Sequence, residues 1–192
     1  MKKLVSICIL AMLDRKVIEE WQSAVIAYGL DLLFSSVLTV LSILLIGVWI
    51  DREMSIVLLL LISIPLQSFG GGYHCKTHLR CWILTIAGYL AADFAAGYLP
   101  VFILWVTALA SAYPFLRLAP VENPKAPFGE AFRRKMQRTV RITYFLGIFT
   151  AVLFSVIRGE WTSAVLSGIT MGGTSVLCAG LCHLRKSFGS VG

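Results

Sequence analysis

Residues 54–82 read MSIVLLLLISIPLQSFGGGYHCKTHLRCW, and the stretch divides into an apolar run and a short polar cluster. The run 54–69 is at the short end for a helix that crosses the hydrocarbon core of a membrane, which takes about 20 residues. Three glycines follow, Gly70, Gly71 and Gly72, and each costs a helix about 1 kcal/mol relative to alanine. The stretch therefore predicts a transmembrane helix that breaks at the glycines, with two histidines and two cysteines just beyond the break.

The same apolar character extends along the whole chain. Of its 192 residues, 58% are hydrophobic and only 14% are charged, whereas a soluble domain has about 25% charged residues. Six apolar runs follow the N-terminal segment: 29–50, 54–69, 82–99, 101–116, 142–157 and 161–182. We therefore expect an all-α integral membrane protein of six transmembrane helices, with a single domain over residues 1–192 and the glycine break between the second and third helices.

The N-terminal segment 1–27 has a different character. Its apolar part, 4–13, would rise roughly 15 Å as a helix, about half of the ~30 Å hydrocarbon core. Lysines precede this part, Arg15 and Lys16 follow it, and there is no small-x-small cleavage site of a signal peptide. We expect an amphipathic helix that lies in the membrane interface, the alternative being the buried end of a longer helix.

Basic residues predict the orientation in the membrane. If the N-terminus is cytoplasmic, 15 of the 17 lysines and arginines fall on the cytoplasmic side, and only Arg52 and Arg158 fall outside. Such a bias in short loops orients a membrane protein. Both termini, the loop with the histidines and cysteines, and a basic loop over 117–141 should therefore face the cytoplasm. The net charge of +7 is then explained by topology and by contact with membrane lipids, without nucleic acid.

His74, Cys75, His78 and Cys81 admit three interpretations. A zinc site is disfavoured because structural zinc sites normally take two ligand pairs from separated segments, and we expect no metal and no cofactor. In the second interpretation the cysteines and histidines are packing residues, which are common near a membrane surface. This interpretation does not explain the three glycines, which cost helix stability. The third interpretation is a cysteine nucleophile with a histidine base, which takes the thiol proton and pairs with the thiolate.

Spacing leaves the choice of base open. His74 and Cys81 are seven residues apart, so a continuous helix would separate their backbones by roughly 10 Å, whereas a hydrogen bond needs about 3 Å between heavy atoms. The glycine break would have to fold His74 back over the start of the third helix. Cys81 would then lie near that helix's N-terminus, where the helix dipole favours a thiolate. His78 is closer to Cys81 along the chain and competes as the base.

Three motifs resemble those of one known family. The pattern GG-x-H-x6-C, here Gly71-Gly72-Tyr73-His74 and then Cys81, resembles the catalytic motif of the accessory gene regulator protein B family. Tyr28-Gly29-Leu30 looks like the family's YGLE/YGIE start of the first spanning helix. Ala119-Pro120-Val121-Glu122-Asn123-Pro124 looks like its AP-x-x-x-x-NKP loop. Chain length and the pattern of apolar segments also fit, so the resemblance covers most of the chain.

The resemblance implies a cysteine endopeptidase of the bacterial cell membrane that processes the precursor of an autoinducing peptide in quorum sensing. Cys81 would be the nucleophile and His74 the general base. Cys81 would release the precursor's C-terminal tail and hold the rest as a thioester, which an internal cysteine or serine converts into a thiolactone or lactone. The family also implies a homodimer. The rival classes are a small membrane transporter or exporter, whose path Asp93 could line, and a metal-binding membrane scaffold.

Four residues beside the break are candidates for supporting roles. Gln67 and Ser68 are close in sequence to His74 and could orient it or bind an oxyanion. The backbone N–H groups of Gly71 and Gly72 could also bind an oxyanion.

Three further residues are singled out by their place or by departure from the family pattern. Asp93 would lie roughly 18 Å along the third helix from Cys81, so we expect a structural or dimer-interface hydrogen bond, or a neutral acid, rather than a third catalytic residue. Cys75 stands where many relatives have alanine, and we expect a spectator. Asp31 stands where glutamate is usual, which keeps the carboxylate but shortens its reach.

The basic loop and the last helix predict contacts with other molecules. Positive charge on the cytoplasmic side usually anchors a protein to anionic lipid, and the alternative is a dock for the acidic tail of a peptide precursor. In the last helix, small residues would allow another helix to approach closely, which would suit a homodimer. The residues concerned are Arg133, Arg134, Lys135, Arg138 and Arg141 in the loop, and Gly168, Gly172, Gly173 and Gly180 in the helix.

Overall fold

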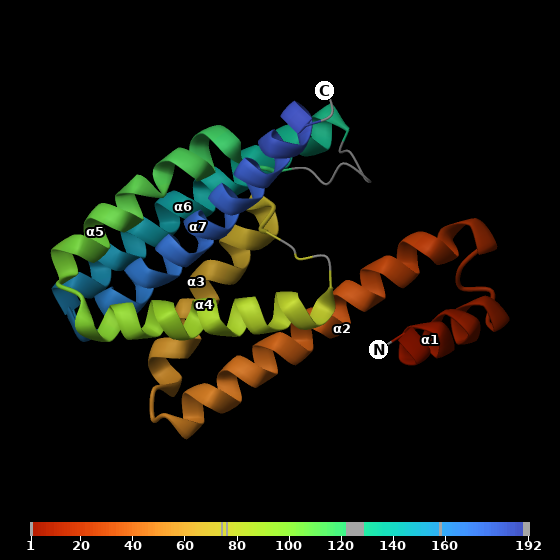
Figure 1. The fold of residues 1–192 in the computed structure, drawn as a ribbon, viewed down its shortest axis with the longest axis horizontal. Helices are drawn as coiled ribbons and strands as arrows, with labels where there is room; N and C mark the ends of the chain where they lie inside the picture. The colour runs from red at the N-terminus through yellow and green to blue at the C-terminus, as the bar shows by residue number, and fades with distance from the viewer. Residues whose placement is uncertain (1, 74, 76, 122–128, 158, 190–192) are drawn as a thin grey trace.

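The computed structural model describes residues 2–73, 75, 77–121, 129–157 and 159–189. Within these residues the chain forms helices joined by short connections, and no strand (Figure 1). In chain order the helices are α1 (Lys2–Asp14), α2 (Glu20–Trp49), α3 (Glu53–Gly70), α4 (His78–Tyr98), α5 (Val101–Ala110), the short π-helical turn η1 (Pro114–Leu118), α6 (Glu130–Ile157) and α7 (Gly159–Gly189).

The prediction of an all-α membrane protein with six spanning helices is confirmed. Six segments of the described chain are long and apolar enough to cross a membrane: Glu20–Trp49, Glu53–Gly70, His78–Tyr98, Val101–Leu118, Glu130–Ile157 and Trp161–His183. They follow the order of the six predicted apolar runs. The fourth span combines α5 with η1.

Two predicted boundaries are wrong. α2 already begins at Glu20, so residues 20–27 belong to the helix of the first span and not to a separate N-terminal helix. Glu19 and Gln22 start this helix as a capping box, in which each side chain binds the other residue's backbone N–H. The predicted loop 117–141 is largely helical, because α6 already starts at Glu130. The position of α1 in the membrane interface stays a prediction.

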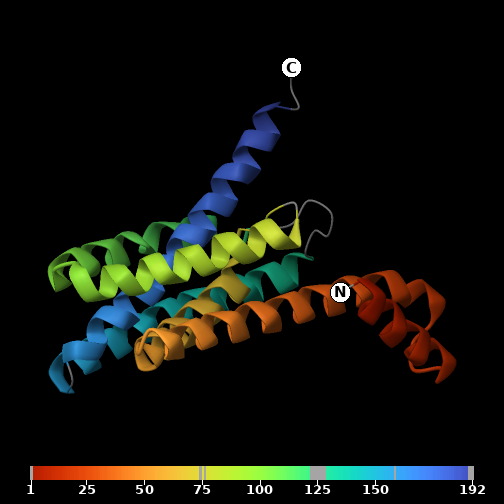
Figure 2. The ribbon, with the colours of Figure 1, turned by 60° about the horizontal axis from the view of Figure 1, so that its bottom comes forward.

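Helix α7 runs through the middle of the bundle, and α2 lies at its edge (Figures 1 and 2). α7 packs against α3, α4, α5 and α6, whereas α2 contacts α1, α3 and α4. In the most apolar window of each span, 50% of the α7 residues are buried inside the chain, against 12% for α2. The main core lies around α7 and includes Leu66, Phe115, Val140, Tyr144, Leu166, Ile169 and Val176.

The glycines of α7 serve packing inside the chain. A Cβ at Gly168 would lie 3.0 Å from the Leu59 carbonyl oxygen of α3, and one at Gly173 would lie 2.5 Å from the Ser111 Cβ, just after α5. Small residues let helices approach in a membrane, where the lipid is as apolar as the side chains. All four of the glycines noted in the last helix are buried. The expectation that this face serves a homodimer is therefore wrong, because the chain's own helices cover it.

The bundle has two distinct ends. The α2–α3 and α4–α5 connections lie at one, which we call the Arg52 end (Figure 1). The α3–α4 connection and residues 119–121 lie at the other, which we call the Cys81 end (Figure 1). The described arginines and lysines of α6 all belong to the Cys81 end: Arg133, Arg134, Lys135, Arg138 and Arg141. The sidedness of charge along the bundle thus follows the predicted bias, and the cytoplasmic orientation of this end stays a prediction.

Candidate active site

The helix break predicted at the glycines is present, and Gly71 makes it. α3 ends at Gly70, and Gly71 has a left-handed backbone with φ of 76°, which glycine adopts without strain. The N–H groups of Gly71 and Gly72 donate to the Gln67 carbonyl oxygen at 3.0 and 3.1 Å. A Cβ at Gly71 would lie 2.3 Å from the Val121 carbonyl oxygen. Both N–H groups are thus engaged with α3, which leaves neither available to an oxyanion.

Two segments distant in sequence hold this turn in place. The Val121 N–H donates to the Gly70 carbonyl oxygen at 3.0 Å, so the segment after η1 lies against the turn. From α7, the Ser175 hydroxyl accepts a hydrogen bond from the Tyr73 N–H at 3.1 Å. Sequence reasoning missed Ser175, because a lone serine in an apolar helix carries no signal and its contact spans 102 residues.

Helix α4 places Cys81 in its first turn. The helix starts at His78, and the preceding Thr77 caps it, its hydroxyl accepting from the Arg80 N–H at 3.4 Å. The Cys81 N–H donates to the Thr77 carbonyl oxygen at 3.0 Å. Cys81 thus lies near the N-terminus of this helix, as predicted. The helix dipole there favours a thiolate over a thiol.

The connection between α3 and α4 folds back onto the start of α4. Cys81 is near enough to raise the pKa of the Cys75 thiol, so residue 75 of the connection lies close to the first turn of the helix. His74, the predicted base, lies outside the described residues, and its pairing with Cys81 stays a prediction.

His78, the competing base, contacts α2. Its Nε2 lies 2.8 Å from Oδ2 of Asp31. The other carboxylate oxygen of Asp31 is buried and has no hydrogen-bond partner among the described residues. The Asp31 carboxylate thus engages one ring nitrogen of His78 and links α2 to α4, and the other ring nitrogen keeps His78 a competing candidate for the base.

Cys75 is held as a neutral thiol. Burial raises the pKa of the Cys75 thiol above its ordinary value, and neighbouring Cys81 raises that pKa further, whereas the Tyr73 hydroxyl and Arg80 lower it. The Cys75 thiolate in turn raises the pKa of the Tyr73 hydroxyl, and Cys182 of α7 adds to this effect. A raised pKa leaves little thiolate at neutral pH, so Cys75 is a weak nucleophile in this position.

Alkylation of Cys75 is expected to need more alkaline pH than alkylation of an ordinary cysteine. Iodoacetamide reacts with the thiolate, so the rate at Cys75 should still rise with pH where an unstructured cysteine peptide has reached its plateau. Cys81→Ser removes the second cause of the raised pKa but leaves burial, so the curve should move only part of the way toward the peptide's. Site-resolved mass spectrometry measures both curves, and a Cys75 curve that coincides with the peptide's would refute the assignment.

Gln67 and Ser68 lie in the last turn of α3 and differ in their surroundings. Ser68 is exposed. The side chain of Gln67 lies beside the glycine turn, with its Cβ 3.5 Å from where a Cβ of Gly72 would be. Its Nε2 is buried and has no hydrogen-bond partner in the described part of the chain. Of the two, Gln67 is therefore the one whose side chain is packed beside the turn, with its Oε1 3.7 Å from where a Cβ of Gly72 would be.

The basic residues at the start of α6 are exposed but have different partners. Arg134 pairs with Glu130 one turn earlier, at 3.0 Å between Nη2 and Oε2. Arg141 donates to the Leu116 carbonyl oxygen of η1 at 3.2 Å, which gives it a structural role. Lys135 and Arg138 lie on the same helix and are also exposed.

The buried carboxylate of Asp93 belongs to the Arg52 end. Asp93 is 5% exposed, its Oδ2 lies 3.4 Å from Arg52 Nε, and its Oδ1 accepts from the Ser55 hydroxyl at 2.5 Å. Twelve residues of α4 separate it from Cys81, or roughly 18 Å. These contacts tie α3 to α4 within the chain, as expected for a structural role.

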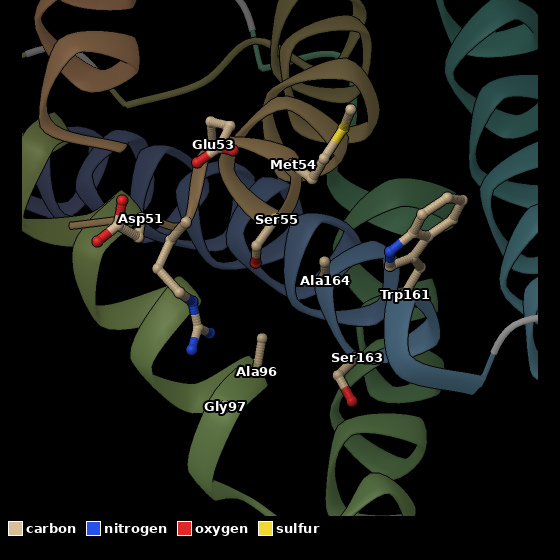
Figure 3. A pocket seen from close by; sticks show the side chains of 10 residues that line it. Asp51, Glu53, Met54, Ser55, Ala96, Gly97, Trp161, Ser163 and Ala164 are labelled. Atoms are coloured by element: carbon tan, nitrogen blue, oxygen red, sulfur yellow. The ribbon is translucent and has the colours of Figure 1, made fainter. Parts of the chain in front are cut away.

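A hollow of about 440 Å³ opens at the Arg52 end, between α3, α4 and the start of α7 (Figure 3). Its wall includes Arg52, Ser55, Gly97 and Trp161. Neither the cysteines nor the glycine turn line it. The candidate site is therefore the Cys81 end, where the thiols are, and not this hollow.

Comparison with curated proteins and with solved structures finds no match. A family model described as accessory gene regulator B matches residues 6–177 of the 192-residue chain. The matched range runs from α1 into α7, and it includes the glycine turn, the start of α4 and the segment after η1. The chain therefore belongs to the accessory gene regulator B family, and it is a multi-pass membrane protein that takes part in the processing of quorum-sensing peptides.

Proposed function

We propose that the chain is a membrane cysteine endopeptidase that removes the C-terminal tail of an autoinducing-peptide precursor, with Cys81 as nucleophile and His74 as general base. The observation that supports the proposal is that α3 ends at the left-handed turn of Gly71 and that Cys81 lies in the first turn of α4. His74 directly precedes Cys75 in the sequence, and its position within reach of the Cys81 sulfur is part of the proposal. The helix N-terminus and a neutral neighbouring thiol both favour a single reactive thiolate at Cys81.

The proposed reaction has two acyl-transfer steps. His74 takes the Cys81 proton, and the sulfur forms a bond to the carbonyl carbon at the junction with the tail. The C–N bond breaks, the tail leaves as an amine that takes the proton from His74, and the upstream peptide stays on Cys81 as a thioester. An internal cysteine of the precursor then attacks this thioester, which closes a thiolactone and frees Cys81, whereas a serine would close a lactone.

The second step exchanges one thioester for another, so it is nearly balanced chemically. Departure of the tail and the orientation of the attacking thiol then direct the outcome. We include the Gln67 amide as a candidate donor to the developing oxyanion, because its side chain lies beside the glycine turn. Ser68, which is exposed, is less suited to this part.

We place the proposed site at the cytoplasmic face, because lysines and arginines gather at the Cys81 end. A precursor that is anchored in the membrane would then meet Cys81 at the inner membrane surface. The proposal includes a homodimer, formed through a face other than the buried glycine face of α7. α2 is the suitable element, since it lies at the edge of the bundle (Figure 2).

The acidic tail of the precursor is proposed to dock on Lys135 and Arg138 at the start of α6. Replacing both by glutamine is expected to raise KM for tail release about five- to tenfold, because two exposed charge contacts are lost. Arg15→Gln with Lys16→Gln is the matched control, since it removes the same charge at a different part of the chain. Equal KM values in the two variants, with equal amounts of inserted protein, would rule out the dock.

The test of the proposed function uses membrane vesicles that contain the full chain. A candidate precursor is a short peptide with a cysteine or serine in its core and an acidic tail, encoded beside the chain's own gene. We expect time-dependent release of the tail and a cyclic product whose mass equals that of the cleaved peptide minus one water. Intact precursor after incubation with correctly inserted chain would contradict the proposal.

A further inference from the structure

Ser175 of α7 reaches the connection that carries the proposed base. Its Oγ accepts a hydrogen bond from the Tyr73 N–H at 3.1 Å. The same oxygen lies 3.0 Å from where a Cβ of Gly72 would be, so the position of Ser175 also gives a reason for glycine there. The contact joins the middle of the bundle to the α3–α4 connection, across 102 residues of sequence.

Helix α7 is a firm support at this point. Val176, the next residue, is 0% exposed, and its Cγ2 lies 2.7 Å from where a Cβ of Gly70 would be. One turn earlier, a Cβ at Gly172 would lie 3.1 Å from the Leu66 side chain of α3. Close packing of this kind leaves little freedom for one helix to shift against another. The Ser175 hydroxyl therefore has a fixed position relative to the glycine turn.

The hydrogen bond between Tyr73 and Ser175 follows directly after the last hydrogen bonds of the α3 C-terminus. The N–H groups of Gly71 and Gly72 still donate to the Gln67 carbonyl oxygen of α3, and Tyr73 is the next residue. Ser175 accepts from the Tyr73 N–H in a part-buried position, and a typical hydrogen bond contributes about 0.5–1.5 kcal/mol. A change in the backbone at Tyr73 would displace the residue after it, which is His74.

Displacement at this position matters because proton transfer depends on short distances. A base must lie within about 3 Å of the atom that it deprotonates. A misplacement of about 1 Å can lower a rate by about 10²-fold, even when its source lies away from the reacting atoms. The hydrogen bonds that the turn makes to α3 in the described part of the connection end with the Gly72 N–H, which donates to the Gln67 carbonyl oxygen.

We propose that Ser175 is a positioning residue of the peptidase: its hydroxyl fixes the Tyr73 N–H, so that the chain enters His74 in the orientation that meets Cys81. The inference depends on the proposed function, because Ser175 itself takes no part in the chemistry. It contacts the backbone of the connection, and it acts through His74.

The first measurement is the rate at which iodoacetamide alkylates Cys81 in Ser175→Ala, in the full chain in membrane vesicles. At neutral pH the rate is expected to fall about fivefold, because the displaced base no longer sustains the thiolate. At alkaline pH, where the thiol ionises without help, the rate should equal that of the unsubstituted chain. A general loosening of the bundle would instead raise the rate at both pH values.

The second measurement is tail release from the candidate precursor. Ser175→Ala is expected to lower kcat about tenfold with KM within twofold, because the base moves while the substrate contacts remain. Ser175→Thr keeps the hydroxyl and should retain most of kcat. The matched control is Thr174→Ala, which changes an exposed neighbour whose hydroxyl donates to the Met171 carbonyl oxygen of its own helix at 2.9 Å.

Several results would overturn the inference. They are an unchanged kcat and Cys81 alkylation rate in Ser175→Ala, a change in KM alone, or an equal loss in Thr174→Ala. If Ser175→Ala does not accumulate in the membrane, Ser175→Cys has a similar volume and a weak acceptor, and the same criteria apply to it. Tail release by Cys81→Ser would defeat the proposed function instead, so the two failures are distinguishable.

Discussion

Cys81→Ser is expected to lower kcat/KM for tail release by at least about 10³-fold, the largest effect of any single substitution in the chain. A serine hydroxyl at this position is almost fully protonated at neutral pH. Neither the helix dipole nor the histidine base makes it as strong a nucleophile as the cysteine thiolate. Release of the tail from the candidate precursor in membrane vesicles gives the rate.

Cys75→Ser is the matched control for Cys81→Ser. The two cysteines are close enough for one to affect the pKa of the other, so both substitutions change the same small region. Each of them replaces one sulfur atom by an oxygen atom. Because burial raises the pKa of the Cys75 thiol, its removal should change kcat/KM by less than about threefold. Comparable losses in the two variants would show that the pair, and not Cys81 alone, carries the reaction.

Gly71→Ala is expected to have a large effect on folding as well as on tail release. The left-handed backbone at Gly71 costs a residue with a Cβ about 1–2 kcal/mol. The added Cβ would also lie 2.3 Å from the Val121 carbonyl oxygen, a backbone atom that no side-chain rotation can move. We expect the free energy of unfolding to fall by at least about 2 kcal/mol. Tail release should be lost as well, because the backbone of the connection that contains His74 changes its conformation.

Gly29→Ala serves as the control for Gly71→Ala. Gly29 lies within α2, and a Cβ there would have nothing within 4 Å. Alanine is the better helix former, so this variant should be as stable as the original chain or slightly more stable. Thermal unfolding in detergent compares the two. A Gly71→Ala protein that melts together with Gly29→Ala and still releases the tail would contradict the assigned role of the turn.

The fold could be predicted largely because each of its features is local in sequence. Apolar runs gave the six spans, and the three glycines gave the end of α3. The start of α2 was placed too late, because a capping box at Glu19 and Gln22 began the helix in a polar stretch. The start of α6 was placed too late for a similar reason: charged residues such as Glu130 and Arg134 can pair along a helix and extend it beyond the apolar part.

The site could be predicted only in part, because its remaining contacts join distant segments. The helix break at the glycines and the place of Cys81 in the first turn of α4 could be predicted from the motif, because both are local in sequence. The contact of His78 with Asp31 could not be predicted, since it depends on how α2 crosses the start of α4. Spacing within a motif also says nothing about Ser175, whose hydroxyl meets the Tyr73 N–H only after α7 has packed against α3.

The most direct test of Cys81 as the nucleophile is the mass of the covalent intermediate. A precursor whose internal cysteine or serine is replaced by alanine can be cleaved but cannot close a ring, so the upstream peptide should accumulate on the enzyme. We predict an adduct with the mass of the upstream peptide minus one water, on the peptide fragment that contains Cys81, and its removal by hydroxylamine as expected for a thioester. Tail release without an adduct on Cys81, or an adduct on Cys75 in its place, would contradict the proposed mechanism.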